Sequence, residues 1–438
     1  KWLTAAKPRA VSGAVHEISR DEFLVAAVDR RGHLVTVNTD FVRLDRSQRS
    51  ELVGTPPLQL WHPNTPAGVL AFLADELLAG RPVGAYLDWV AQDGSAYAAF
   101  TTVAPVGPDF IVTAIRPLRS DLCAQKMARY APIRQVERAA AKWGLNAQGV
   151  AALGYDKLTE TLAETGQVYQ TGFGGLDLIA EMAARSAWPD GLATRPGING
   201  RPASMLLSCH SLDAALRLWS ERHQALTQLA DSLIGVTPHL SATTVAARLA
   251  VAGLMGAGSS SAVMRDVAAR LARVGDLLED LSHQLQMFHH SCEISRVWIA
   301  LAEIHVAACN RIVVDSLDHG PARLAPEALR YLSQALQDDL TAIDELAEQQ
   351  ASETAAIIHH LDLADSLTID HDQLLDDLGQ QTPGGRDHPQ LEQLTTALGT
   401  VATALPTAVD LARTMASVIA PGGIRRLQTQ VGRLQTSL

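Results

Sequence analysis

Apolar and polar positions in the first part of the chain follow the pattern of short strands separated by turns. Residues 33–38 alternate between polar and apolar side chains, as a strand with one buried face does. Two later apolar runs flank Gln92-Asp93-Gly94, and Asp-Gly is a strong signal for a β-hairpin. Residues 67–79 instead carry apolar side chains at helical spacing. The pattern predicts two strands, small helices, one longer helix and three further strands.

Helical periodicity dominates from residue 121 onward. Residues 121–142 predict an amphipathic helix that leaves the sheet. Residues 165–205 contain many Gly and Pro and predict an irregular segment or a linker. Residues 271–313 predict one long helix, because apolar or small residues recur there at alternating spacings of three and four, as a heptad seam. The seam positions are Leu271, Val274, Leu278, Leu281, Leu285, Phe288, Cys292, Ser295, Ile299, Ala302, Val306, Cys309 and Val313.

A turn signal after the heptad seam, Asp318-His319-Gly320-Pro321, precedes a second run of apolar residues at helical spacing. The two runs predict a long antiparallel helical hairpin or coiled coil. Since an apolar seam that is exposed on one hairpin needs a partner, the seam also predicts a homodimer. A further break is expected at 382–385.

These patterns predict an α+β domain, with an antiparallel five-stranded sheet and small helices, followed by a mostly α-helical region. A chain of 438 residues has room for several such parts. We expect an N-terminal segment at 1–20, the α+β domain at 21–120, a helical linker region with the Gly/Pro-rich loop at 121–265, the helical hairpin at 266–380, and C-terminal helices with a tail at 381–438.

Composition and charge exclude several classes of protein. The 36 basic and 47 acidic residues give a net charge of −11, which argues against broad nucleic-acid binding. Hydrophobic residues make up 47% of the chain and exclude wholesale disorder. The four cysteines lie far apart and form no CxxC, so we expect a cytoplasmic protein without a disulfide scaffold. No run of about 20 uninterrupted apolar residues occurs, so we expect no membrane span.

Five short motifs in the first domain resemble, in order and spacing, those of the PAS domain of aerotaxis receptors and related energy sensors. They are Asn38-Thr39-Asp40-Phe41 for NxxF, Glu51-Leu52-Val53-Gly54 for ELxG, His62-Pro63-Asn64-Thr65-Pro66 for HPxxP, Gly80-Arg81-Pro82-Val83-Gly84 for part of GxPWxG, and Asp93-Gly94-Ser95-Ala96-Tyr97 for the DGxxYW hairpin. The resemblance implies a domain that senses redox state, oxygen or another small ligand.

Members of this family typically hold FAD, so the resemblance implies FAD as the cofactor. The cofactor-contacting positions that it implies here are Trp61, His62, Asn64, Trp89 and Asn38. Of these, His62 corresponds fully to a flavin-contacting residue of the family, whereas Trp61 and Trp89 would supply stacking surfaces.

The chain departs from the family at four positions of the flavin-contacting motifs. The family has an Arg before HPxxP, an Asp and a Met within it, and a Trp in the following turn, and this chain has Trp61, Asn64, Thr65 and Val83 there. Haem is the second candidate cofactor and would need an axial His, for which the domain offers His33 and His62. A domain without a cofactor, used for dimerisation or for another small ligand, is the third interpretation.

The helical half resembles the cytoplasmic hairpin of methyl-accepting chemotaxis receptors. The resemblance lies in the heptads, the turn, and residues 319–335, which are similar to the family's return helix. Residues 307–315 stand where receptors carry the Glu-centred tip segment that docks the kinase and the coupling protein. This tip is divergent, because only the general register survives and Asp315 is no clear substitute for the Glu. The resemblance implies a dimer whose partners are chemotaxis kinases, coupling proteins or other signalling proteins.

The sequence gives little indication of a metal site or a catalytic site. His289 with Cys292, and His305 with Cys309, can each share a helix face, but the two pairs lie too far apart on one helix to hold one ion. We therefore expect no metal site, and no enzyme, since no catalytic signature occurs. The sequence predicts a cytoplasmic sensory signal-transduction protein. The alternative is a structural or scaffolding protein that kept this architecture but lost its cofactor and kinase coupling.

Overall fold

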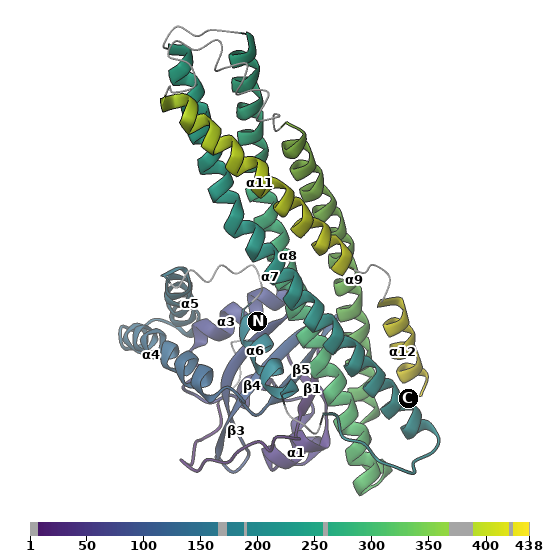
Figure 1. Cartoon of the computed structure of the whole chain (residues 1–438). Helices are drawn as coiled ribbons and strands as arrows, with labels where there is room; N and C mark the ends of the chain where they lie inside the picture. Colours follow the sequence, from purple (N-terminus) through teal and green to yellow (C-terminus); the bar gives the residue numbers. More distant parts are fainter. Residues whose placement is uncertain are drawn as a thin grey trace. The chain divides into compact units, whose positions relative to one another are not determined.

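The structure is a computed structural model (Figure 1). It describes residues 8–164, 173–187, 191–256, 262–367, 389–419 and 424–437. The chain forms two compact units. Unit 1 comprises Lys1–Ser220, Arg296–Ile343 and Gly423–Leu438, and unit 2 comprises Glu221–Ser295 and Asp344–Gly422. Unit 1 contains the β-sheet, and the described residues of unit 2 are almost entirely helical.

All five predicted strands are present and form one sheet in unit 1. They are β1 (Leu24–Val28), β2 (Leu34–Val37), β3 (Val83–Val90), β4 (Ala96–Val106) and β5 (Asp109–Ile115). Their order across the sheet is β2-β1-β5-β4-β3, and all neighbours are antiparallel. The predicted hairpin turn joins β3 to β4, where Gly94 has a φ of 80° that a side chain would strain. The expected fold class, an α+β domain followed by long helices, is confirmed.

Small helices between β2 and β3 cover one face of the sheet. They are α1 (Thr39–Asp45), α2 (Arg49–Leu52), the 3₁₀-helix η1 (Pro57–Gln59) and α3 (Ala67–Leu78). Leu24, Ala26 and Val28 of β1 share a hydrophobic core with Leu73 and Leu77 of α3. Because successive side chains of a strand point to opposite faces, every second strand residue enters this core.

The opposite face of the sheet is buried as well. Val25, Ala27, Ile111 and Thr113, which alternate with the core residues of β1 and β5, are all shielded from solvent. One element that contacts the sheet is α6 (Gly175–Ser186), which packs against β3. Neither face of this sheet is therefore an open surface.

The expectation that residues 165–205 are irregular is confirmed for 191–200, but helix α6 and the start of a helix at Arg201 correct it elsewhere in the described residues. Gly174, in the left-handed region at a φ of 74°, forms the N-cap, and Leu178 and Met182 are buried at helical spacing. The glycines thus mark the start of a helix, because Gly takes positive φ without strain. The expectation also covers 165–172 and 188–190, which lie outside the described residues.

Both edge strands of the sheet form hydrogen bonds with loop segments. On β2, the Leu34 N–H donates to the Thr55 carbonyl at 2.9 Å. On β3, the Val90 N–H donates to the Leu60 carbonyl at 2.7 Å. These bonds satisfy backbone groups that an open edge would present to solvent.

Two helices follow the sheet and pack near α3. They are α4 (Ser120–Lys142), which confirms the predicted helix at 121–142, and α5 (Ala147–Glu164). Helices α3 and α5 cross at two glycines, since a Cβ on Gly68 would lie 2.1 Å from the carbonyl carbon of Gly154. Glu137 of α4 accepts hydrogen bonds from the backbone N–H groups of Ala67 (3.1 Å) and Gly68 (2.7 Å). It thereby caps α3, whose first N–H groups have no partner within their own helix.

Replacing Gly68 with alanine is expected to force α3 away from α5. Overpacking of this kind lowers the free energy of unfolding by about 1–3 kcal/mol. Gly149→Ala is the matched control within α5, because its new methyl group would meet nothing nearer than a Leu145 side-chain carbon at 3.2 Å. Thermal unfolding followed by circular dichroism measures both. An unchanged melting temperature in Gly68→Ala would contradict the close crossing.

The remaining chain is built from long helices. They are α7 (Arg201–Gly256), α8 (Ala262–His319), α9 (Pro326–Ser366), α11 (Pro389–Val418) and α12 (Ile424–Thr436). The predicted turn is confirmed, because α8 ends at His319, Gly320 has a φ of 101°, and the short 3₁₀-helix η3 (Pro321–Arg323) precedes α9. The predicted break at 382–385 lies outside the described residues.

The heptad seam of α8 is buried within the chain itself. Every seam position from Leu271 to Val313 is shielded from solvent. In unit 2 the seam shares a core with residues of α7, α9 and α11, among them Leu233, Ile357 and Leu405. The seam therefore needs no second chain to cover it, and it no longer supplies a reason for a homodimer. The oligomeric state stays a prediction.

Two of the described helices, α8 and α11, are long and apolar enough to cross a membrane by length and composition alone. The apolar window of α8 is 89% buried in the structure, and that of α11 is 39% buried. Mostly buried core helices pass the same test, so the two windows are weak evidence for a span.

Candidate functional site

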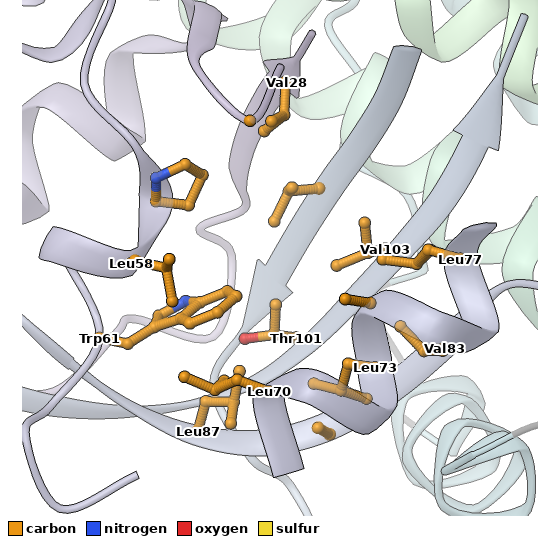
Figure 2. A pocket seen from close by; sticks show the side chains of 15 residues that line it. Val28, Leu58, Trp61, Leu70, Leu73, Leu77, Val83, Leu87, Thr101 and Val103 are labelled. Carbon is orange, nitrogen blue, oxygen red and sulfur yellow. The ribbon is translucent and has the colours of Figure 1, made fainter. Parts of the chain in front are cut away.

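An apolar pocket of about 40 Å³ lies between the inner face of the sheet and α3 (Figure 2). Strand alternation supplies one wall, and residues at helical spacing in α3 supply another. In Figure 2 the Trp61 indole lies beside Leu58, with Leu73 and Leu77 of α3 on the other side of the view. The pocket is lined by Val28, Gly32, Pro57, Leu58, Trp61, Leu70, Leu73, Ala74, Leu77, Val83, Ala85, Leu87, Thr101, Val103 and Val112.

Two side chains give the pocket its polar groups. The Thr101 hydroxyl accepts a hydrogen bond from Nε1 of Trp89 at 3.0 Å, which leaves the hydroxyl hydrogen able to donate. The Nε1 of Trp61 is buried and has no hydrogen-bond partner. Leaving a buried donor unsatisfied costs about 1–3 kcal/mol. The pocket therefore suits a ligand that brings one or two acceptor atoms into an apolar environment.

The structure brings together two of the residues expected to contact a cofactor. Trp61 lines the pocket, and the fully buried Trp89 lies behind it, with 6.4 Å between ring centroids and an interplanar angle of 87°. Phe41 of α1 packs edge-on against Trp89 at 5.6 Å. Edge-to-face contacts of this kind are favourable, and here they connect the pocket with α1.

His62 and Asn64 lie outside the pocket lining. The His62 N–H donates to the Asp88 carbonyl at 2.8 Å, and its Nδ1 accepts a hydrogen bond from the Asn64 N–H at 3.0 Å. His33, the other candidate axial ligand, is also outside the lining, and its Nδ1 lies 3.7 Å from an Asp29 oxygen. The HPxxP segment thus supports the pocket through its backbone, and neither histidine faces the space.

Asn38, the fifth residue expected to contact a cofactor, instead forms hydrogen bonds with the backbone of its own domain. Its Oδ1 accepts hydrogen bonds from the N–H groups of Val25 in β1 (3.0 Å) and Phe41 in α1 (3.1 Å), so it joins the strand to the start of the helix. In the same helical turn, Asp40 accepts two hydrogen bonds from Arg311 of α8, at 2.9 and 3.0 Å. A two-pronged arginine–carboxylate pair fixes both distance and orientation.

Unit 1 also contains the tip of the helical hairpin. Tyr331 of α9 donates a hydrogen bond to Asp109 of β5 at 2.8 Å, which adds to the Arg311 contact. Residues 307–315, which stand in place of the receptor tip, are mostly buried, Ala308 and Val313 completely so. This segment is therefore engaged by the sheet domain of its own chain, through Arg311 and Asp40.

Glu181 of α6 is a buried acceptor that the sequence did not reveal. It accepts hydrogen bonds from the Tyr86 hydroxyl (2.7 Å) and from the N–H groups of Leu118 (2.7 Å) and Arg119 (3.1 Å). Burial, together with the adjacent Glu181, raises the pKa of Tyr86, so its hydroxyl stays a donor. Glu181 thereby joins α6 to β3 and to the segment that leads into α4.

Glu303 of α8 is a second buried acid that the sequence did not reveal. It lines a small cavity with Arg185 of α6 and with Asp213 and Arg217 of α7, which form an ion pair at 3.0 Å. Burial, reinforced by the charge of Asp213 and opposed by that of Arg217, raises the pKa of Glu303 to about 7. This carboxyl group therefore titrates near neutral pH.

The histidines considered as metal ligands have protein partners. The fully buried His305 places Nδ1 2.7 Å from an Asp339 oxygen, and Nε2 of His289 lies 3.1 Å from Asp231. In the parts of the chain that the structure describes, no group of three or more His, Cys, Asp or Glu side chains is arranged to hold a metal ion.

Comparisons with known proteins find similarity to solved structures over part of the chain. No family model matches the chain, and no curated protein matches it. Among solved structures, a crystal structure of a variant of Vivid matches with 13% sequence identity and a TM-score of 0.19, covering 26% of this chain and 91% of that chain. The five antiparallel strands, with helices between the second and the third, form an N-terminal PAS-like domain. A helical region follows it.

Proposed function

We propose that the N-terminal PAS-like domain is a sensory module that binds a small, mostly apolar molecule between its sheet and α3. The observation that carries this proposal is the buried Nε1–H of Trp61, which has no acceptor in an otherwise apolar pocket. Small-molecule sites typically combine an apolar lining with a few placed polar groups. An acceptor atom of the ligand would remove the cost of the unsatisfied donor.

A flavin fits the lining less well than a smaller ligand does. The flavin ring system carries several polar edge atoms, but the side chains of the lining offer only the Trp61 N–H and the Thr101 hydroxyl as hydrogen-bond partners. The cavity of about 40 Å³ has room for a few water molecules, so a flavin would need the α3 wall to move. Haem lacks an axial ligand in the lining, which contains neither His33 nor His62. We therefore favour a small apolar ligand over FAD, and FAD over haem.

We infer that ligand occupancy reaches the helical region through α1. The rings of Trp61, Trp89 and Phe41 form successive edge contacts, and Asp40, next to Phe41, holds Arg311 of α8. A ligand that displaces Trp61 would favour one arrangement of these contacts over another. The result is a shift of population between two docked states of α8, which is how a binding event acts at a distance.

Chemotaxis kinases and coupling proteins would need access to the hairpin tip. Residues 307–315 are mostly buried, and Arg311 and Tyr331 hold the tip against the sheet domain. We infer that such a partner binds only after the tip is released, and that the role of the protein in the cytoplasm is non-catalytic. A chain whose tip never leaves the sheet domain would instead act as a structural scaffold, which is the alternative function.

The ligand proposal is tested by filling the pocket. Ala74→Phe places a ring in the pocket from α3 and is expected to abolish retention of a small molecule in the purified protein. Leu78→Phe adds the same ring on the exposed side of α3 and is expected to leave retention unchanged. Molecules released by heating are identified by mass spectrometry, and visible spectra before and after dithionite reveal a flavin or a haem.

Three outcomes bear on the ligand proposal. A colourless molecule retained by the parent and by Leu78→Phe, but not by Ala74→Phe, supports it. Equal retention in both variants, or none in the parent, contradicts it. Where a ligand is found, hydrogen exchange of α1 and α8 with and without that ligand tests the relay, which predicts a change in both helices.

A further inference from the structure

Helix α4 presents a row of cations beside a groove that is separate from the apolar pocket. Arg134, Arg138 and Lys142 recur every four residues, so they lie along one side of the helix. Together with Asn64 and Gln135 they line a surface groove of about 550 Å³. This volume is in the range of sites that bind small molecules.

The positive charge of the groove is largely unneutralised. Nη1 of Arg134 donates to the Asn64 carbonyl at 3.2 Å, and in the described part of the chain no ion pair joins Arg138 or Lys142 to a carboxylate. Two acids lie near Arg134. Glu137 is bound to the first N–H groups of α3, and burial raises the pKa of Asp88 and so disfavours its charged form. The groove is thus a local concentration of positive charge on a chain whose net charge is −11.

We propose that this groove binds the phosphate chain of a small molecule, as in a nucleoside di- or triphosphate. The helix rises about 12 Å from Arg134 to Lys142, which suits several linked phosphates better than one. Arginine side chains bind phosphate oxygens in a two-pronged geometry, and lysine adds a point charge. A long polyanion such as nucleic acid would meet the repulsion of the whole acidic chain, whereas a compact ligand inside the groove meets mainly the local field.

Isothermal titration calorimetry of the full chain with sodium tripolyphosphate, ADP, ATP and a single-stranded oligonucleotide, at an ionic strength of about 0.15 M, tests this site. The double variant Arg138→Gln/Lys142→Gln is expected to weaken binding about tenfold or more, since two charge-assisted contacts are lost. Arg425→Gln/Arg426→Gln is the matched control, because it removes two exposed positive charges from α12 of the same unit. Circular dichroism checks that each variant is folded.

The outcomes separate the phosphate site from the other possibilities. Binding of tripolyphosphate and nucleotides alike, lost only in the α4 variant, supports a phosphate-chain site, and binding of nucleotides alone supports one that also recognises the base. Equal loss in the two double variants, no binding at this ionic strength, or binding restricted to a single-stranded oligonucleotide would overturn the proposal. Ala74→Phe is expected to bind the phosphates normally, so failure of the apolar-ligand proposal leaves this one standing.

Discussion

Replacing Glu181 with alanine is expected to cost about 3–5 kcal/mol of the free energy of unfolding, because each buried donor left without an acceptor costs about 1–3 kcal/mol. The substitution orphans three donors at once, the Tyr86 hydroxyl and the N–H groups of Leu118 and Arg119. Water that enters the vacated space recovers part of the loss, which keeps the expected value below the sum of three full penalties. The effect is large because one side chain holds both strand β3 and the segment that leads into α4.

Two further variants separate the hydrogen bonds of Glu181 from its packing. Glu181→Gln keeps one acceptor oxygen and the same shape, so a loss of about 1–2 kcal/mol is expected. Tyr86→Phe removes one donor together with its need for a partner and is expected to be the mildest of the three. Urea denaturation followed by circular dichroism gives the stabilities. If the alanine and glutamine variants are equally stable, the three hydrogen bonds are not what Glu181 contributes.

Replacing Glu303 with glutamine is expected to stabilise the protein at pH 8 and to leave its stability nearly unchanged at pH 4. The pKa of Glu303 is about 7 in the folded chain, against an ordinary value of 4.5. As pH rises from about 4.5 to about 7, the unfolded chain gives up this proton first, so the parent loses up to about 3 kcal/mol of stability. Glutamine has the same shape and no charge to desolvate.

The measurement is the difference in denaturation midpoint between Glu303→Gln and the parent, taken at several pH values from 4 to 8. Other titrating groups cancel in this difference as long as they do not interact with residue 303. Glu164→Gln, which removes an exposed carboxyl at the end of α5, is the control and should show a flat difference. A flat difference for Glu303→Gln as well would mean that the carboxyl titrates at its ordinary pKa.

Local sequence signals predicted the sheet and the long helical hairpin correctly. Alternation at 33–38, the Asp-Gly pair and the turn around Gly320 each act over a few residues, and each is present as expected. Trp61 lines the pocket, and its contact with a cofactor stays a prediction. The seam of α8 was correctly expected to be buried, but periodicity does not say what covers it, and the cover is supplied by the same chain.

Contacts between segments that are distant along the chain could not be predicted from the sequence. Glu181 and its partner Tyr86 are 95 residues apart in the sequence, and Glu137 and its partner Gly68 are 69 residues apart. No local sequence pattern therefore predicts either carboxylate's hydrogen bonds. The glycines in 165–205 predicted an irregular segment, but Gly174 is the N-cap of helix α6. His62 was expected in the site because of its motif, yet its backbone and ring are used to shape the segment beside Trp61.

Loop segments already occupy the hydrogen-bonding edges of the sheet at Leu34 and Val90, so a partner cannot lengthen the sheet there with a strand of its own. The same bonds guard the folded domain against edge-to-edge association with further copies. A partner of the sheet domain would therefore have to recognise side chains at these positions, by shape and charge, because the backbone groups there are already paired.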